Sequence, residues 1–200
     1  MRKDFVFLAS ASPRRSELLR QIGVRFEVRG AAISEEPLPG EAPADYVLRL
    51  AKAKAHAVAV ALAPSERRPV LAADTAVVLD GELLGKPVDT AEAAAMLERL
   101  SGRSHRVLTA VALDCGTETE SLLSDSEVRF RATTASERLA YCATGEPFDK
   151  AGGYGIQGHA AVFVESLQGS YSGVVGLPLF ETAALLARAG VQTWLTARAA

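Results

Sequence analysis

The sequence predicts a globular protein that mixes strands with helices, and three observations support this prediction. Of its 200 residues, 48% are apolar and 23% are charged, so the chain can bury a sizeable core. Short apolar runs suited to strands alternate with segments whose apolar residues recur at helical spacing. No stretch rich in proline, serine or charge divides the chain, which predicts a single domain over residues 1–200, built as one body or as two closely packed lobes.

Charge and cysteine content argue against several classes of protein. The formal net charge is −2, so we expect neither a nucleic acid nor an acidic membrane as partner. No apolar run approaches the roughly 20 residues that span a bilayer. Cys115 and Cys142 show no metal or redox spacing, and no signal-type apolar region begins the chain. A cytoplasmic protein with free thiols is therefore expected.

A strand-to-helix turn within residues 8–19 is the feature around which the chain is organised. Residues 5–8 form an apolar run typical of a short buried strand. Ser12 and Pro13 mark the first turn of a helix that is expected to end at Gly23.

Two arginines in the first turn of this helix point to an anionic ligand. A helix N-terminus exposes unpaired N–H groups and a positive dipole end, so acidic residues are usual there instead of Arg14 and Arg15. Backbone donors, the guanidinium groups and the hydroxyls of Ser10 and Ser12 make a plausible phosphate cradle. A capped surface helix with two solvated arginines is an equally weighted alternative.

The next segments are a half-exposed strand at residues 25–29 and a long loop at residues 30–43. Glu35 and Glu36 form the acidic pair of this loop, facing either solvent or a metal ion. Considered alone, the pair is expected to face solvent.

A helix is predicted from residue 43 to about residue 62, and Lys54 lies within its apolar stripe. Lys54 projects between Ala51 and Val58, whereas Lys52 projects well away from the stripe. A lysine in this position either extends its ammonium group out to solvent or finds an anion at the edge of a pocket. The first outcome is the commoner one.

Asp74 interrupts an otherwise apolar strand at residues 69–79, which a tight turn at Asp80 and Gly81 joins to residues 82–84. A lone carboxylate inside an apolar strand costs several kcal/mol unless it is paired, hydrogen-bonded or protonated. The local sequence supplies no partner, so a functional role is favoured. Lys86 follows, where the two-stranded ribbon brings another cation back toward Asp74.

The second half continues the mixed pattern and contains one glycine-rich segment. Its predicted elements are a helix at 90–100, paired antiparallel strands at 105–113 and 121–132, a helix at 136–143 capped by Thr133 or Thr134, a strand at 160–167, a turn at 169–178 and a helix at 179–189. Residues 145–159 hold five glycines among Asp, Lys, Tyr and Gln, which suits close backbone approach to a ligand, with a flexible loop as the alternative. His56 and His105 lack a partner at metal spacing, so structural or solvated roles are expected.

Four cations and two carboxylates in the first half form the inventory for a polyphosphate ester. Cations hold phosphate oxygens, and carboxylates hold a divalent metal or activate water. The chain has no P-loop, G-x-S-x-G or plausible Ser/His/Asp pattern, which favours metal-assisted hydrolysis. The six residues are Arg14, Arg15, Lys54, Lys86, Asp74 and Glu35.

These residues lie in six ordered motifs, and together they resemble the Maf family of nucleoside triphosphate pyrophosphatases, the septum-formation-inhibitor family. The motifs are LASASPRR at 8–15, ADT at 73–75, GKP at 85–87, LSGRSH at 100–105, DKAGGYGIQG at 149–158 and VGLPL at 175–179. The resemblance implies an α/β fold similar to inosine triphosphatases, with an elongated mixed β-sheet, flanking helices and two lobes around a central cleft. It also implies hydrolysis of a nucleoside triphosphate to the monophosphate and pyrophosphate with Mg²⁺ or Mn²⁺.

The resemblance further implies a role for each matching residue. Asp74 would accept the proton from water and, with Glu35, hold the metal. Four residues would hold the phosphates: Ser10, Arg14, Lys54 and Lys86. Three would sit where the family sets base specificity: Arg15, Thr75 and Gln157.

The motifs also favour one branch of the family. The branch that prefers 7-methyl-GTP has a tryptophan before the arginines and Ser-Asp-Gln in place of residues 73–75, whereas this chain resembles the branch acting on dTTP and UTP. The carboxamide of Gln157 can pair with the carbonyl and N–H edge of a pyrimidine. Gly153, often alanine in the family, is a small departure, and the register of Glu35 is the least specific part of the match.

Two alternatives to this function stay open. One is a non-catalytic nucleotide-binding regulator of septum formation. The other keeps the chemistry and changes the substrate to modified or purine triphosphates. The family's tendency also makes a homodimer a reasonable expectation.

Overall fold

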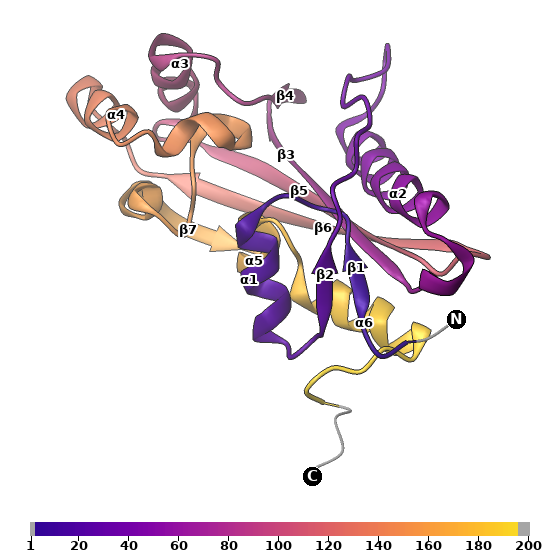
Figure 1. Cartoon of the computed structure of the whole chain (residues 1–200). Helices are drawn as coiled ribbons and strands as arrows, with labels where there is room; N and C mark the ends of the chain where they lie inside the picture. Colours follow the sequence, from indigo (N-terminus) through magenta and orange to yellow (C-terminus); the bar gives the residue numbers. More distant parts are fainter. Residues whose placement is uncertain (1–2, 196–200) are drawn as a thin grey trace. The chain divides into compact units, whose positions relative to one another are not determined.

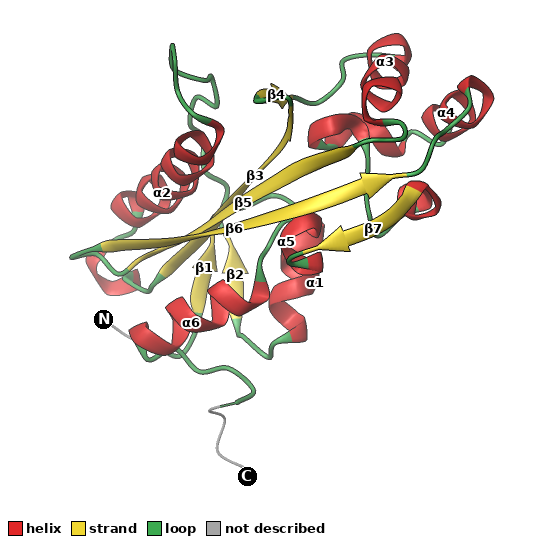
Figure 2. Ribbon diagram, turned by 180° about the vertical axis from the view of Figure 1, so that it is seen from behind, coloured by secondary structure: helices red, strands yellow, loops and turns green. Residues whose placement is uncertain are grey.

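The computed structural model describes residues 3–195, and seven strands form one mixed sheet with helices around it (Figures 1 and 2). The strands are β1 (Val6–Leu8), β2 (Phe26–Val28), β3 (Val70–Leu79), β4 (Glu82–Leu84), β5 (Ser104–Asp114), β6 (Thr119–Phe130) and β7 (Val164–Gln168). The helices are α1 (Pro13–Gln21), α2 (Pro43–Ala61), α3 (Thr90–Leu100), α4 (Ala135–Cys142), α5 (Tyr171–Val175) and α6 (Leu179–Ala189). Short 3₁₀ turns occupy Pro64–Glu66, Glu146–Asp149, Ala151–Gly153 and His159–Phe163.

The sheet runs in the order β2-β1-β3-β5-β6-β7, and β4 pairs with β3. β1 pairs in parallel with both β2 and β3. β4 pairs antiparallel with β3, and β7 antiparallel with β6. Parallel and antiparallel pairs within one helix-flanked sheet confirm the predicted α/β class with a mixed sheet.

The chain divides into two compact units. The first contains the chain up to Asp74, Thr109–Ser124 and the chain from Gly176 onward. The second contains Thr75–Leu108 and Asp125–Val175. The strands β3, β5 and β6 each contribute one end to each unit. The prediction that residues 1–200 act as a single domain stays a proposal.

α2 packs its apolar stripe into the core of the first unit, as its helical spacing predicts. Val47, Leu50, Ala51 and Ala55 are fully buried, and Val58 is nearly so. Burying such a stripe supplies most of the stability of an amphipathic helix. The helix begins at Pro43, whose ring fits the first helical position, and it ends at Ala61.

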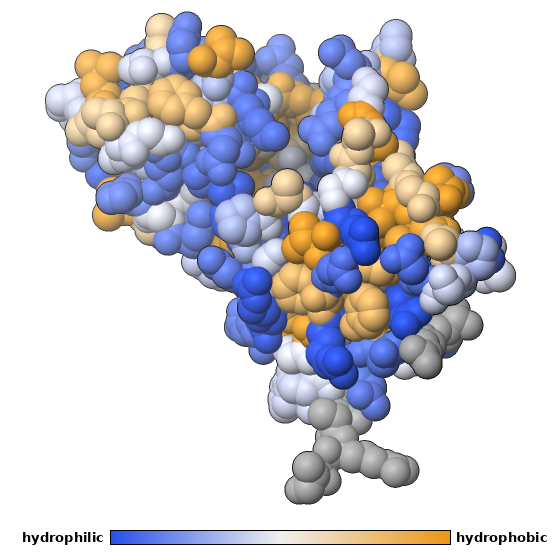
Figure 3. Space-filling view, viewed as in Figure 1, coloured by the Kyte–Doolittle hydropathy of each residue, from blue (hydrophilic) through white to orange (hydrophobic). Residues whose placement is uncertain are grey.

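Arginine side chains cover aromatic rings at the β1–β2 edge of the first unit. Arg20 lies over Phe26 and Arg29 lies over Phe7, with guanidinium carbons 5.3 and 5.1 Å from the ring centroids. Figure 3, which is coloured by hydropathy, shows hydrophilic and hydrophobic residues interleaved on the face that it presents. β2 is the terminal strand of the sheet and is three residues long. A short edge strand flanked by charge resists pairing with other chains.

The core of the second unit is built around aromatic rings in edge-to-face contact. Phe130 makes edge-on contacts with His105 and Tyr154, with ring centroids 5.1 and 4.8 Å away. The buried His105 lies 2.8 Å through Nε2 from the Tyr154 hydroxyl. His105 therefore has the structural role that was expected, whereas the ring of His56 is exposed beside Asp114.

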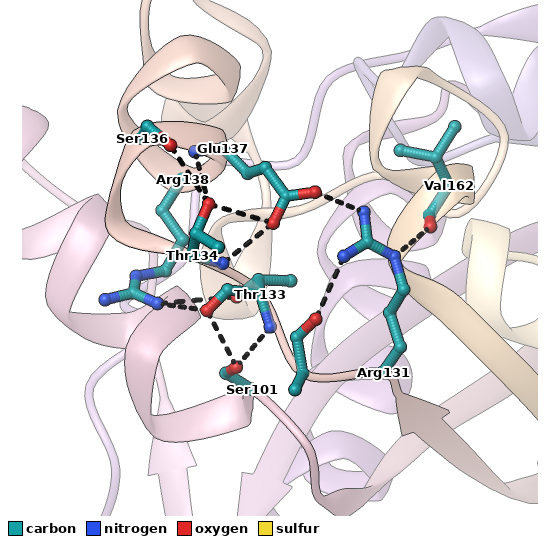
Figure 4. A network of polar contacts seen from close by, with 9 residues as sticks. Ser101, Arg131, Thr133, Thr134, Ser136, Glu137, Arg138 and Val162 are labelled. Atoms are coloured by element: carbon teal, nitrogen blue, oxygen red, sulfur yellow. Dashed lines mark hydrogen bonds and ion pairs between the residues drawn. The ribbon is translucent and has the colours of Figure 1, made fainter.

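A capping box begins α4 and shows that Thr134 is the cap residue (Figure 4). The Glu137 amide donates to the Thr134 hydroxyl at 3.3 Å, and the Thr134 amide donates back to the Glu137 carboxylate at 2.7 Å. Arg131 binds the same carboxylate at 2.7 Å, and this hydrogen bond is the main reason that the pKa of Glu137 falls to about 2.

Two predictions for the last third of the chain need correction. Residues 160–167 were expected to form a strand, but His159–Phe163 is a 3₁₀ turn and β7 begins only at Val164. The buried residues of this turn, Ala160 and Phe163, are three apart, which fits a 3₁₀ turn and not a strand. The expected turn at 169–178 contains the short helix α5, where the Gly173 amide donates to the Ser170 hydroxyl at 3.0 Å.

The buried histidine predicts a pH-dependent stability. Burial lowers the pKa of His105 to about 4 from its usual 6.5. Between these values the unfolded chain binds a proton that the folded chain does not, so stability falls as the pH drops from 6.5 to 4. Urea unfolding should show that His105→Gln removes about 3 kcal/mol of this pH dependence. Equal pH dependence in His105→Gln and wild type would contradict this prediction.

None of the helices within residues 3–195 combines the length and the hydropathy that a membrane span requires.

Candidate functional site

Ser10 lies where β1 leads into α1, and its hydroxyl organises that turn. The amide of Ser12 donates to the Ser10 hydroxyl at 3.2 Å, and so does the Arg15 guanidinium, also at 3.2 Å. Arg15 donates a further hydrogen bond to the Gly176 carbonyl at 2.8 Å. Arg15 and Arg14 are both half-buried, so the alternative of two fully solvated arginines is wrong.

Parallel strand pairing explains why distant residues meet in the first unit. β1 lies between β2 and β3, with Leu8 opposite both Val28 and Leu71. The chain leaves β1 toward Ser10, leaves β2 into the long loop, and continues along β3 to Asp74. The carboxyl ends of neighbouring parallel strands share one edge of a sheet, which is where ligands bind in open α/β sheets.

Lys54 joins two carboxylates just beyond the carboxyl end of β1, because Asp74 lies three residues past Leu71, the residue opposite the end of β1. Its ammonium nitrogen lies 2.6 Å from Oδ1 of Asp74 and 2.6 Å from Oε1 of Glu35. Lys54 is 8% exposed and Asp74 is 6% exposed, while about half of the Glu35 side chain stays accessible. The expectation that Lys54 extends to solvent is therefore wrong, whereas Glu35 is exposed as expected and in addition pairs with Lys54. The alternative, a buried lysine facing an anion, is confirmed.

The same face of α2 also holds the loop that carries Glu35. Tyr46 lies eight residues before Lys54, so both project from one side of the helix. The Tyr46 hydroxyl donates to the backbone carbonyl of Glu35 at 2.9 Å. Arg49 donates to the carbonyl of Glu36 at 3.1 Å and to the carboxylate of Glu41 at 2.7 Å. Two side chains of a rigid helix thus fix the backbone on which Glu35 sits.

The electrostatic environment keeps Asp74 basic. Burial raises the pKa of Asp74, and the charge and hydrogen bond of Lys54 and the charge of Arg15 only partly oppose this. Burial also raises the pKa of the Tyr46 hydroxyl, with the charges of Asp74 and Glu35 adding to it. Burial lowers the pKa of Arg15, against the charge of Asp74, although a guanidinium stays protonated in proteins. A carboxylate with a raised pKa accepts a proton more readily than an ordinary one.

Three of the predicted site residues belong to the second unit. Thr75 is the one partly accessible residue of the otherwise buried β3. Lys86 is exposed, and the neighbouring Gly85 carbonyl accepts a hydrogen bond from the Gly152 amide at 2.9 Å. Gln157 is exposed next to the buried Ile156.

Sequence reasoning missed Tyr46 and Arg49. The eight-residue spacing from Tyr46 to Lys54 is a signal that could have placed both on one face of the helix. Arg49 gives no comparable signal, because it lies only five residues before Lys54 and so projects from a different side of the helix. Within residues 3–195, no group of three or more His, Cys, Asp or Glu side chains could hold a metal ion.

Comparison with known proteins finds a family model, curated relatives and solved structures to which this chain is similar. A family model described as Maf-like protein matches residues 5–189. A dTTP/UTP pyrophosphatase of Aromatoleum aromaticum is 55% identical over 192 residues, which cover 90% of this chain and 93% of that protein. Its counterpart in Burkholderia pseudomallei is 56% identical over 198 residues, which cover 94% of each chain. A solved structure of a nucleoside-triphosphatase / dITP/XTP pyrophosphatase from Mycobacterium abscessus is 16% identical, covers 97% of this chain and 99% of that one, and has a TM-score of 0.41.

Proposed function

The chain belongs to the Maf family, and from this premise we propose that it hydrolyses dTTP and UTP to the nucleoside monophosphate and pyrophosphate. The observation that carries the proposal is the buried carboxylate of Asp74, which has a raised pKa and contacts the ammonium group of Lys54. A buried ion pair contributes little net stability, so stability alone does not account for it.

In the proposed reaction, Asp74 accepts a proton from the attacking water. The oxygen of that water forms a bond to the α-phosphorus, and the bond from the α-phosphorus to the bridging oxygen breaks. Pyrophosphate leaves with the bridging oxygen, and the proton passes from Asp74 to solvent. Lys54 stabilises negative charge beside the base, because its ammonium group lies within 2.6 Å of both carboxylates.

Four side chains are proposed to hold the triphosphate, and three to select the base. Ser10 and Arg14 lie at the turn into α1, where backbone N–H groups and the helix dipole add to their attraction for phosphate. Arg15, a proposed base-selecting residue, donates a hydrogen bond to the hydroxyl of Ser10, a proposed phosphate ligand. A substitution of Arg15 is therefore expected to affect phosphate binding as well as base selection. The phosphate ligands are Ser10, Arg14, Lys54 and Lys86, and the base-selecting residues are Arg15, Thr75 and Gln157.

A divalent metal fits the donor set of Asp74 and Glu35. Mg²⁺ typically takes one or two protein carboxylates and completes its shell with substrate phosphates and water. Asp74 and Glu35 present carboxylate oxygens to a single ammonium group, so two hard anionic ligands already converge. When bound, Mg²⁺ or Mn²⁺ would neutralise phosphate charge and polarise the reacting phosphorus.

The direct test is product analysis with dTTP and Mg²⁺. The protein should release dTMP and pyrophosphate in equal amounts. Orthophosphate alone, or no product, would refute the proposal. Tight dTTP binding without turnover would support a nucleotide-sensing regulator of septum formation instead. Faster hydrolysis of modified or purine triphosphates in a competition panel would show that the reaction is as proposed but that the preferred substrate is a different triphosphate.

The location and assembly of the chain are part of the same proposal. A nucleotide-hydrolysing enzyme of this family is expected to act in the cytoplasm on free nucleotides, with no nucleic acid or membrane as partner. A homodimer is the proposed assembly, which light scattering of the purified protein would test.

Removing the Tyr46 hydroxyl should weaken the binding of the Mg²⁺ that supports activity. Tyr46→Phe deletes the hydrogen bond to the Glu35 carbonyl and loosens the loop that carries this carboxylate. Since such a bond contributes about 1 kcal/mol, the Mg²⁺ concentration for half-maximal activity should rise about fivefold, with a smaller change in kcat. Mg²⁺ titrations of activity measure this effect, and Tyr171→Phe is the matched control. An unchanged Mg²⁺ requirement would show that Tyr46 does not position Glu35.

A further inference from the structure

Glu146 lies near the start of the glycine-rich segment 145–159 in the second unit, is mostly buried, and contacts the end of the same segment, the loop at residues 155–159 that carries Gln157. Only 15% of its side chain is exposed. One carboxylate oxygen accepts a hydrogen bond from the Tyr141 hydroxyl at 2.8 Å. The other accepts two hydrogen bonds from His159, one from the amide and one from ring Nδ1, each at 2.9 Å. Burial alone would raise the pKa of Glu146, but these hydrogen bonds outweigh it and lower the pKa.

The contacts of Glu146 hold the chain on both sides of Gln157. On the C-terminal side, Glu146 binds the His159 amide directly. On the N-terminal side, the Tyr141 hydroxyl accepts from the Gly155 amide at 3.2 Å while donating to Glu146. Gln157 therefore lies between two hydrogen-bonded backbone amides. Glu146 binds the His159 amide directly, and it is linked to the Gly155 amide through the Tyr141 hydroxyl.

Glycines allow the loop to lie directly on these side chains. A Cβ atom at Gly158 would come within 2.3 Å of the Glu146 carboxylate. A Cβ atom at Gly155 would come within 2.8 Å of the Lys150 side chain. Lys150 in turn donates to the Glu146 carbonyl at 2.6 Å. Glu146 and Lys150 are thus joined to each other, and each lies directly against one glycine beside Gln157. Gln157 itself is exposed, although the side chains that hold its loop are wholly or partly buried.

We propose that Glu146, acting with Tyr141, is a positioning residue that fixes Gln157 and so sets base selectivity. This inference rests on the proposed function, in which Gln157 meets the edge of the pyrimidine. A carboxamide discriminates between bases only if its donor and acceptor are held in register with the base, because a displacement of about 1 Å can cost a hundredfold in rate. Glu146 does not touch the substrate in this proposal and acts only through the loop.

A carboxylate suits this position because the Tyr141 hydroxyl, the His159 amide and the His159 ring all donate to it. The carboxylate of Glu146 offers acceptors on both oxygens to the Tyr141 hydroxyl and to two groups of His159. Glutamine has one acceptor oxygen, and its NH₂ group would face another donor. Glu146→Gln therefore loses at least one of these three hydrogen bonds while keeping the volume of the side chain.

Two measurements on the full-length protein test the inference. The first is the ratio of kcat/KM for dTTP to that for dCTP, since cytosine carries an amino group where thymine has a carbonyl. Glu146→Gln and Tyr141→Phe should each lower this ratio about tenfold or more, mainly by raising KM for dTTP. The second is hydrogen exchange of the loop without nucleotide, where Glu146→Gln should expose the His159 amide and Tyr141→Phe the Gly155 amide.

Matched controls separate positioning from general effects of substitution. Glu165→Gln removes an exposed carboxylate of β7 that pairs with Arg129, and Tyr171→Phe removes an exposed hydroxyl of α5. Both should change the selectivity ratio by less than about twofold. If Glu146→Gln fails to fold, Tyr141→Phe still tests the inference, because it keeps the contact between Glu146 and His159.

The outcomes are distinct for the two proposals. Faster loop exchange with loss of selectivity supports the inference. Unchanged exchange, or faster exchange with unchanged selectivity, overturns it. If wild type does not hydrolyse dTTP, the proposed function fails and the selectivity role fails with it, while the exchange data still decide whether Glu146 anchors the loop.

Discussion

Replacing Asp74 with Asn should abolish most dTTP hydrolysis and leave nucleotide binding intact. The amide has nearly the same shape as the carboxyl group but cannot accept the proton of the attacking water. Loss of a general base lowers kcat by about a hundredfold to ten-thousandfold. Product release measured by chromatography and dTTP affinity measured by calorimetry would separate the two effects. Asp80→Asn, which changes an exposed carboxylate just after the same strand, should keep full activity.

The same substitution should raise thermal stability at neutral pH. The pKa of Asp74 is raised in the folded chain, chiefly by burial. The folded chain therefore binds the Asp74 proton more tightly than the unfolded chain does. This contribution to the free energy of unfolding is present at low pH and is lost as the pH rises through the pKa that Asp74 has in the folded chain. A neutral amide removes the cost of holding the ionised form, so Asp74→Asn should melt at a higher temperature than wild type at pH 7. Retained hydrolysis, or a lower melting temperature, would contradict the role assigned to Asp74.

Replacing Lys54 with Met should lower kcat/KM for dTTP by about a hundredfold or more. The ammonium group contacts both Asp74 and Glu35, so its removal leaves two carboxylates without their shared cation. The pKa of Asp74 should then rise further, because Lys54 is the largest influence that lowers it. The acidic limb of the pH–rate profile should move to higher pH as a result.

A matched control for this substitution lies on the same helix. Lys52→Met removes an exposed lysine of α2 and should change neither the rate nor the pH profile. If Lys54→Met lowered the rate without moving the acidic limb, Lys54 would act on the phosphates alone. If it left kcat/KM unchanged, the assignment of Lys54 to the site would be wrong.

Much of the fold was predictable from local pattern. The apolar stripe of α2 and the apolar run of β3 are confirmed, because burial of one helix face or of a central strand is visible as periodicity or continuity in the sequence. The 3₁₀ turn at His159–Phe163 was not predicted, because the short apolar run that it begins is also typical of a strand in the sequence.

The candidate site likewise contains residues that the sequence indicates and contacts that only the structure reveals. Lys54 and Asp74 stood out because each is a charged residue inside an apolar pattern. The pairing of Lys54 with Glu35 was not predictable, and neither were the contacts from Tyr46 and Arg49, because they depend on where a long loop returns to the helix. The support that Glu146 gives to the glycine-rich loop was hidden for the same reason.

The sequence by itself determined the α/β class, most of the strands and helices, and an inventory of charge suited to a triphosphate. Only the tertiary structure decided which charges meet. Periodicity along a chain reports which side of an element is buried, whereas ion pairs between Lys54, Asp74 and Glu35 require the register of parallel strands and the path of a loop. Those are set by packing across the whole unit, since no local segment contains both partners.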